Sequence, residues 1–146
     1  MIVYTDGSSS PDRCGGWAWA ASENVFASGS STDTTNQRME VKAAIEAIKA
    51  NYNGKLIIVT DSRYLCDCIN KKWYKKWRSN GWKNTYGEDV ANKDLWVELL
   101  DLLEGKVVKF AWVKGHDGNA MNELADALAV TAKKELQHEL RNNVGP

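Results

Sequence analysis

The stretch "KLIIVTDS", residues 55–62, decides the fold class of this chain. Its apolar run is nearly continuous rather than alternating, which is typical of a strand buried on both faces of a parallel sheet. The opening stretch "MIVYTDGS", residues 1–8, also predicts a strand and also carries a Thr-Asp pair at its end. If the two strands are parallel neighbours, Asp6 and Asp61 lie together at the carboxyl edge of the sheet, where open α/β sheets bind their ligands.

Two further strands are predicted directly after the first one. The stretches "GGWAWAAS", residues 15–22, and "NVFASGSS", residues 24–31, are separated only by a short polar turn. This arrangement is typical of an antiparallel meander. The first third of the chain therefore predicts three strands that run antiparallel in sequence order.

Helices are predicted where apolar residues recur every three or four positions. Residues 34–51 show this spacing, and Leu124, Leu128 and Leu136 are expected to face the core from the last helix. The other predicted elements are helices at residues 63–73, 92–105 and 122–140, and a strand at residues 106–113. Three strands followed by helices that alternate with strands indicate an α/β sheet of mixed direction.

The overall composition predicts a single globular domain without membrane segments. The 146 residues carry 19 basic and 19 acidic side chains, so the formal net charge is zero. No apolar run approaches the length of a membrane span, and the opening residues lack the layout of a signal peptide. The cysteines Cys14, Cys66 and Cys68 have neither zinc-finger nor redox spacing. We therefore expect reduced thiols and a cytoplasmic protein.

Four carboxylates stand where ordinary surface charge is not expected. Asp6 and Asp61 follow apolar strand residues. Glu40 shares a helical stripe with apolar residues that include Ile48, so it is expected to point toward the sheet. Asp126 follows an apolar Leu-Ala pair and lies on the edge of the inward face of the last helix. The sequence thus predicts that these acids approach one another.

Such a group of carboxylates favours a divalent metal ion. Carboxylates that crowd together repel, which raises the pKa of at least one of them unless a cation neutralises the site. Ligands that are all oxygen suit Mg²⁺ or Mn²⁺, and two ions about 4 Å apart activate a water and stabilise the leaving oxygen in phosphodiester hydrolysis. The alternative is that Asp6 and Asp61 are cap residues and that Glu40 and Asp126 are surface acids. Spacing alone leaves both interpretations open.

Several motifs resemble, in order and spacing, those of type 1 ribonuclease H. They are "YTDGS" (4–8), "TTNQRMEVKAAIEAI" (34–48), "VTDSRYL" (59–65), "NKDLW" (92–96), "WVKGHDG" (112–118) and "NELAD" (122–126). The resemblance runs from Ile2 to about Lys133. It implies an α/β ribonuclease H-like fold, with a five-stranded mixed sheet, the first three strands antiparallel and helices on both faces. It also implies a catalytic domain at residues 1–133, followed by the end of the last helix and a C-terminal tail at residues 134–146.

The same resemblance implies an activity and a set of catalytic residues. The activity is endonucleolytic hydrolysis of the RNA strand of an RNA–DNA hybrid, giving a 5′-phosphate and a 3′-hydroxyl. The implied metal ligands are the four acids already singled out, holding two Mg²⁺ ions with substrate bound, and Mn²⁺ is a possible substitute. His116, in a Gly-flanked loop, matches a mobile histidine that handles protons or helps the product leave; by itself it reads as an exposed turn residue. We expect a monomer.

The stretch "KKWYKKWRSNGWK", residues 71–83, combines cations with indoles and contains no acid. One interpretation is an amphipathic helix with core tryptophans and a solvated basic face. The scarcity of other apolar residues and the unbroken positive charge favour a nucleic-acid contact instead. The resemblance identifies the stretch as a basic protrusion that holds the DNA strand through Trp73, Lys76 and Trp77.

Further substrate contacts are implied by the resemblance. Thr35 and Asn92 match a pocket for a DNA phosphate. The residues that match contacts to the RNA strand are Gly7, Ser8, Ser9, Ser10, Asn36 and Gln37. Hydroxyl and amide side chains can donate to and accept from a 2′-hydroxyl, although helix caps and turns use the same residue types. Some family members have a Cys where Ser9 falls, and Arg63 stands at a position that commonly holds a different side chain.

Two other functions compete with hydrolysis of hybrids. One is a non-catalytic module that binds hybrids through the basic stretch; the complete set of acids argues against it. The other is a DNA nuclease or strand-transfer enzyme on a related fold, which the sugar-reading residues disfavour.

Overall fold

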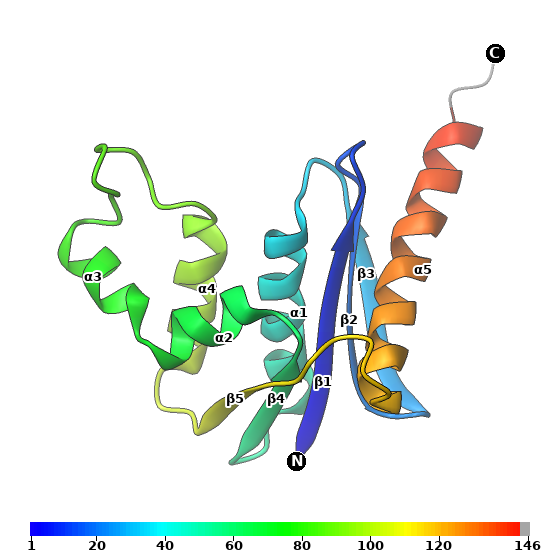
Figure 1. Ribbon diagram of the computed structural model, residues 1–146, viewed down its shortest axis with the longest axis horizontal. Coiled ribbons are helices and arrows are strands. Elements are labelled where there is room, and N and C mark those ends of the chain that lie inside the picture. Colours follow the sequence, from blue (N-terminus) through cyan, green and yellow to red (C-terminus); the bar gives the residue numbers. More distant parts are fainter. Residues whose placement is uncertain (144–146) are drawn as a thin grey trace.

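The computed structural model describes residues 1–143, and the chain forms one sheet flanked by helices (Figure 1). Residues 144–146, the last of the predicted C-terminal tail, lie outside the described residues. None of the helices in the described part is long and apolar enough to cross a membrane.

The sheet has five strands in the order β3-β2-β1-β4-β5. The strands are β1 (Ile2–Ser9), β2 (Gly15–Ser22), β3 (Val25–Ser31), β4 (Leu56–Thr60) and β5 (Val108–Trp112). β2 pairs antiparallel with β1 and β3, whereas β4 pairs parallel with β1 and β5. The predicted mixed sheet, with its first three strands antiparallel, is confirmed.

The strand β1 is longer than the sequence predicts. The Thr-Asp pair was expected to end it, yet the ladder with β2 continues past Asp6, through Gly7, to Ser9. Hydrogen bonds to β2 therefore hold this segment extended in spite of its glycine. On the other side, Thr5 pairs in parallel with Thr60, so Asp6 and Asp61 follow paired residues of neighbouring strands.

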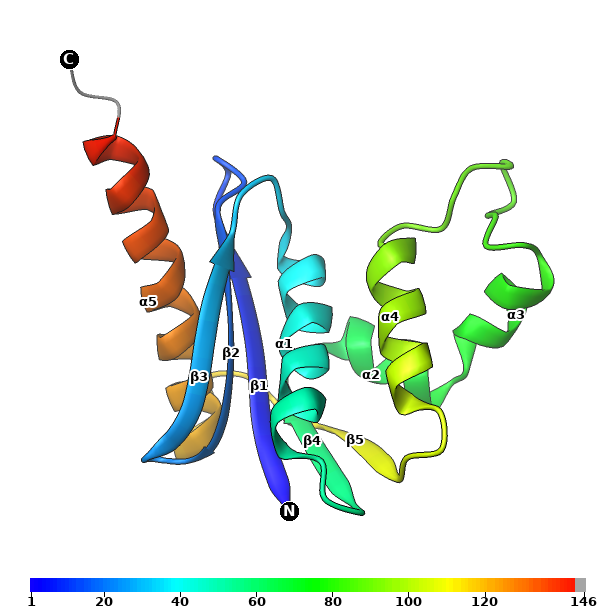
Figure 2. The ribbon, with the colours of Figure 1, turned by 180° about the vertical axis from the view of Figure 1, so that it is seen from behind.

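Within residues 1–143 the chain forms five helices. They are α1 (Asn36–Asn51), α2 (Arg63–Asn70), α3 (Trp73–Ser79), α4 (Lys93–Leu103) and α5 (Ala120–Asn142). The sheet stands between α1 and α5, and α4 lies on the side of α1 (Figure 2). The prediction of helices on both faces is therefore confirmed.

The predicted helix at residues 63–73 is in fact two helices. Lys72 adopts a left-handed backbone conformation, with φ of 56°, between α2 and α3. The amide groups of Lys71 and Lys72 donate to Asp67 and Ile69 and so close the end of α2. The break redirects the chain, which lets the next helix turn one of its tryptophans onto the core.

The core face of α5 also differs from the prediction. Leu124, Leu128 and Leu136 are only half-buried, whereas the fully inward positions are held by small residues, chiefly Ala125, Ala129 and Ala132. The reason is the close approach of α5 to β2 at Gly16, where a Cβ would collide with the backbone oxygen of Ala129. Leucines at the centre of this contact would push the helix away from the sheet.

We expect Gly16→Ala to destabilise the protein. The added methyl meets backbone atoms of α5, which move only with the helix, so the cost is that of overpacking, about 1–3 kcal/mol. Urea denaturation measures the change in the free energy of unfolding. Ser30→Ala, at the exposed residue that pairs with Gly16 across β2 and β3, is the matched control and should change stability by less than about 0.5 kcal/mol. Equal stability of the two variants would contradict this account of the packing.

Candidate active site

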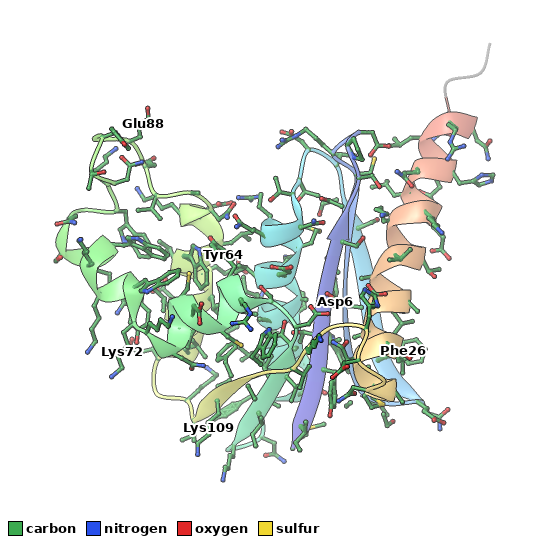
Figure 3. All side chains as sticks on the ribbon, in the orientation of Figure 1. Asp6, Phe26, Tyr64, Lys72, Glu88 and Lys109 are labelled. Atoms are coloured by element: carbon green, nitrogen blue, oxygen red, sulfur yellow. The ribbon has the colours of Figure 1, made fainter. Side chains whose placement is uncertain are left out.

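Four elements bring the predicted carboxylates toward one edge of the sheet. Asp6 lies in β1, with α1 on one side and α5 on the other (Figure 3). Asp61 follows the last residue of β4, Glu40 lies in the second turn of α1, and Asp126 lies in the second turn of α5. Gly7 permits the approach of α1, because a Cβ there would collide with the backbone of Met39 and Glu40.

Asp6 is the most buried of the four, with 5% of its surface exposed. Burial raises the pKa of Asp6 to about 8, and the negative charges of Asp61 and Asp126 act in the same direction. One interaction opposes the shift: the Gly7 amide donates a hydrogen bond of 2.8 Å to Asp6 Oδ1. Asp6 therefore faces other carboxylates with little compensation.

Glu40 is in a similar environment on the neighbouring helix. Burial raises the pKa of Glu40 to about 7, the charge of Asp61 adds to the shift, and a hydrogen bond from the Ser62 hydroxyl opposes it. That bond is 2.6 Å long and ends at Glu40 Oε2, while Ser62 Oγ also accepts from the amide of Leu65 and so caps α2. The charge of Asp61 thus raises the pKa of both Asp6 and Glu40.

Sequence reasoning missed the neutral side chains that orient these acids. Ser62 is one, and its position as N-cap directly after Asp61 is a signal that could have found it. Asn122 is another: it is almost fully buried, and its Nδ2 donates to Asp61 Oδ2 at 3.4 Å. Trp112 Nε1 donates to the backbone oxygen of Asp61 at 3.0 Å. The last two contacts join segments about 50 and 60 residues apart, so no local pattern signals them.

The loop between β5 and α5 passes directly over Asp61. A Cβ on Gly115 would lie 2.7 Å from Asp61 Oδ2, so glycine is required for this close passage. His116, the next residue, is exposed and has a left-handed backbone with φ of 56°. The structure thus places His116 on the loop beside the acids but leaves its side chain in solvent.

The chemistry of the donors fits a divalent cation. Within residues 1–143, no three acidic, histidine or cysteine side chains already stand around one point as the ligands of an ion. The charge of Asp61 nevertheless raises the pKa of Asp6 and that of Glu40, and no cationic side chain opposes either shift. A hard cation bound to these oxygens would remove the repulsion, which is the role that Mg²⁺ takes in carboxylate sites.

Most of the predicted substrate contacts line one groove. It has a volume of about 540 Å³, and its walls include Ser9, Ser10, Thr35, Asn36, Gln37 and Asn92. The amide and hydroxyl groups of Ser9 both donate to Asn36 Oδ1, at 2.6 and 2.9 Å, so the Asn36 NH₂ group remains to face a ligand. Thr35 caps α1, whereas Asn92 Nδ2 donates to the hydroxyl of Tyr64 at 3.0 Å.

Gly7 and Ser8 do not belong to this groove. Gly7 lies against the backbone of α1, and the Ser8 hydroxyl accepts a hydrogen bond of 3.2 Å from Lys133 Nζ on α5. These residues therefore serve the packing of β1 between its two helices, whatever else they contact.

The basic stretch at residues 71–83 divides into an outer and an inner part. Trp73 is 41% exposed and Lys76 is exposed, both on α3. Trp77 is half-buried and packs against Trp82 and Trp96, with ring centroids 6.0 and 5.8 Å away. The expectation that tryptophans of this stretch have little core to pack against is wrong for Trp77 and Trp82, since both pack against the hydrophobic core.

Comparisons with known proteins match nearly the whole chain. The family model described as RNase H matches residues 1–134. A ribonuclease H of Syntrophomonas wolfei subsp. wolfei is 44% identical over 143 residues, which cover 93% of this chain and 97% of that protein. A ribonuclease H of Francisella tularensis subsp. novicida is 45% identical over 141 residues, covering 93% of this chain and 92% of its own.

Two solved structures share the fold. One is LC9-RNase H1, described as a type 1 RNase H with the type 2 active-site motif, with a TM-score of 0.76, 31% identity and coverage of 92% of this chain and 72% of that one. The other is a foamy viral protease-reverse transcriptase in complex with dsDNA, with a TM-score of 0.76, 28% identity and coverage of 90% and 92%.

We expect the metal-free protein to lose stability as the pH rises from 5 to 8. An Asp in the unfolded chain ionises near 3.8, whereas folded Asp6 holds its proton to about 8. Between these values the folded state binds more protons, so raising the pH favours unfolding. Glu40 acts in the same direction up to about 7. The expected loss is about 2 kcal/mol or more, measured by urea denaturation in EDTA.

Asp6→Asn should remove most of this dependence and make the metal-free protein more stable at pH 8. Asp101→Asn, at an exposed carboxylate of α4, is the matched control and should leave the dependence intact. Three other carboxyls have a pKa that is lowered by their partners, so they change the stability only below this pH range. They are Asp12, Asp89 and Asp94. A wild-type profile that is flat between pH 5 and pH 8 would contradict the electrostatic account.

Proposed function

Because the chain belongs to the ribonuclease H family, we propose that it is a metal-dependent endonuclease that hydrolyses the RNA strand of RNA–DNA hybrids and leaves 5′-phosphate and 3′-hydroxyl ends. The observation that carries the proposal is the placement of Asp6 and Glu40. Both carboxyl groups are largely withdrawn from water, and the charge of Asp61 also raises their pKa. No cationic side chain opposes the rise. Such a site is stable in its ionised form only with a cation present.

In this proposal Asp6, Glu40, Asp61 and Asp126 hold the ions. Two Mg²⁺ ions, or Mn²⁺ in their place, supply Lewis-acid activation of the attacking water and stabilisation of the leaving oxygen. The neutral donors keep the carboxylates oriented, since Gly7, Ser62 and Asn122 donate to Asp6, Glu40 and Asp61 respectively. His116, exposed on the adjoining loop, takes up or delivers a proton or helps the product depart.

The groove between β1, α1 and the segment before α4 receives the hybrid. Asn36 has its oxygen committed to Ser9, so its NH₂ group donates to a sugar hydroxyl of the RNA strand. Gln37 and Ser10 complete these contacts in the groove, and Thr35 and Asn92 hold a phosphate of the DNA strand. Ser8 and the backbone at Gly7 contact the RNA strand outside the groove.

The outer part of the basic stretch binds the DNA strand, as in a type 1 enzyme with a basic protrusion. The exposed indole of Trp73 packs against deoxyribose, and Lys76 neutralises a phosphate. Trp77 supports this surface from inside the protein, where it packs against Trp96. The protein acts as a monomer in the cytoplasm, with residues 1–133 as the catalytic domain and the remainder of α5 leading into the tail.

Asp6→Asn and Glu40→Gln should each abolish hydrolysis while hybrids still bind. Each change removes an anionic ligand but keeps the shape and the hydrogen bond to Gly7 or Ser62. The measurement uses four labelled duplexes with Mg²⁺: RNA–DNA hybrid, RNA, DNA, and DNA with a single ribonucleotide. Wild-type protein should cleave the hybrid at least 1,000-fold faster than either variant, about 4 kcal/mol of barrier.

The control for these variants is Asp101→Asn, which should cleave hybrids at the wild-type rate. Wild-type activity in Asp6→Asn would refute the catalytic assignment. Hybrid binding without cleavage by the wild-type protein would instead identify a binding module, and cleavage of DNA in preference to hybrid would identify a DNA nuclease.

Trp73→Ala and Trp77→Ala should separate binding from stability. Trp73→Ala removes an exposed indole, so hybrid affinity should fall about 5-fold or more while stability changes by less than about 0.5 kcal/mol. Trp77→Ala removes a ring packed on Trp82 and Trp96, so it should destabilise the protein by about 2 kcal/mol or more. Fluorescence anisotropy with a labelled hybrid and urea denaturation measure the two effects. Equal losses of stability in both variants would contradict the division.

A further inference from the structure

Arg63 and Trp112 form a stacked pair beside Asp61. β5 ends at Trp112, which pairs with Thr60, and the chain of β4 continues through Asp61 and Ser62 to Arg63, the first residue of α2. The guanidinium carbon of Arg63 lies 4.2 Å from the centroid of the Trp112 ring. Because Trp112 Nε1 also donates to the backbone oxygen of Asp61, the indole is fixed at both its ring face and its edge.

The stability of the fold does not account for a cation at this position. Arg63 lies in the first turn of α2, where a positive charge opposes the helix dipole and where no acidic residue compensates it. Both members of the pair are exposed, Trp112 to 40%. In the described part of the chain Arg63 forms no ion pair, whereas Arg13 and Arg38 are each paired with an aspartate.

The connection between α2 and β5 is already secured without the stack. Asn70 Nδ2, at the other end of α2, donates to the backbone oxygen of Phe110 at 3.1 Å. The parallel ladder and the indole N–H hold Trp112 in place as well. An uncharged side chain at residue 63 would therefore serve the packing equally well, so the guanidinium calls for another explanation.

Stacking leaves the hydrogen-bonding edge of a guanidinium available. The guanidinium of Arg63 lies over the indole, and its five N–H donors form a planar fork, none of which is used in an ion pair within the described residues. A side chain that is already held against a ring loses less conformational freedom when it binds. Its geometry matches the two oxygens of a phosphate, which it can bind with two parallel hydrogen bonds.

We propose that Arg63, held on Trp112, binds a phosphate of the RNA strand next to the one that is cleaved. This inference rests on the proposed function, because the strand that is cleaved lies against Asp61, two residues from Arg63. The DNA strand is assigned to a different surface, formed by α3 and by the groove at Thr35 and Asn92. Arg63 is thus a specificity residue that sets the position of the cleaved strand, and it is not a metal ligand.

The test measures hybrid affinity as a function of salt in EDTA, where no cleavage occurs. Each phosphate contact contributes about 0.9 to the slope of log K against log salt. Arg63→Gln should weaken hybrid binding about 3- to 10-fold at low salt and reduce the slope by about 0.9. Arg63→Lys should keep the slope with a smaller loss of affinity, and Trp112→Leu should weaken binding less than Arg63→Gln does. Lys106→Gln is the matched control, since it removes an exposed cation at the opposite end of β5.

The outcomes separate this inference from the function on which it rests. Wild-type affinity and slope in Arg63→Gln would overturn it. So would a loss of affinity with an unchanged slope, which would assign Arg63 to a sugar hydroxyl or a base edge, and so would an equal loss in Lys106→Gln. A wild-type protein that fails to bind or cleave hybrids would refute the proposed function itself. Urea denaturation of each variant checks that it is folded.

Discussion

Thr5 of β1 pairs in parallel with Thr60 of β4, so Asp6 and Asp61 occupy equivalent positions after the paired residues of two neighbouring central strands. The rest of the site follows from this register. Two aspartates in that position repel, and burial of Asp6 increases the penalty for its ionised form. A slip of one residue in β1 would turn Asp6 to the other face of the sheet and replace it with Gly7 or Thr5. The register between β1 and β4 therefore also determines which carboxylates repel one another at the candidate site.

Close packing brings the other two acids to this point. Gly7 lets α1 lie against β1, which delivers Glu40, and Gly16 lets α5 lie against β2, which delivers Asp126. The same contacts exclude water from Asp6, so the packing that stabilises the fold creates the unfavourable environment of its carboxylates. Neutral donors, Ser62 above all, satisfy the acids without cancelling their charge. These donors keep the acids oriented, while the raised pKa of Asp6 and Glu40 means that a cation is needed to keep both ionised near neutral pH.

A protein without net charge can still carry a basic surface, because six of its 19 Lys and Arg side chains are concentrated in residues 71–83. Three of these six lie on α3. The structure uses two tryptophans of α3 for different purposes. Trp77 joins the core and anchors the helix, while Trp73 remains at the surface. Arg63 is a separate cation, held by an indole of β5 at the side of the acids. Contacts with tryptophans therefore position the cations of α3 and Arg63, in addition to their positions in the sequence.

The sequence by itself determined the fold class and the candidate acids, because both depend on local patterns. Apolar runs, helical spacing and the repeated Thr-Asp pair are visible in short windows, and the order of motifs adds the family resemblance. Only the tertiary structure decided which side chains meet. The continuation of β1 past Asp6 depends on its ladder with β2, the break at Lys72 on the packing of Trp77, and the alanine face of α5 on a glycine more than 100 residues away. Asn122 and Trp112 became part of the site for the same reason: their partner Asp61 is remote in sequence, and no local pattern records a contact that forms only when the sheet and helices pack.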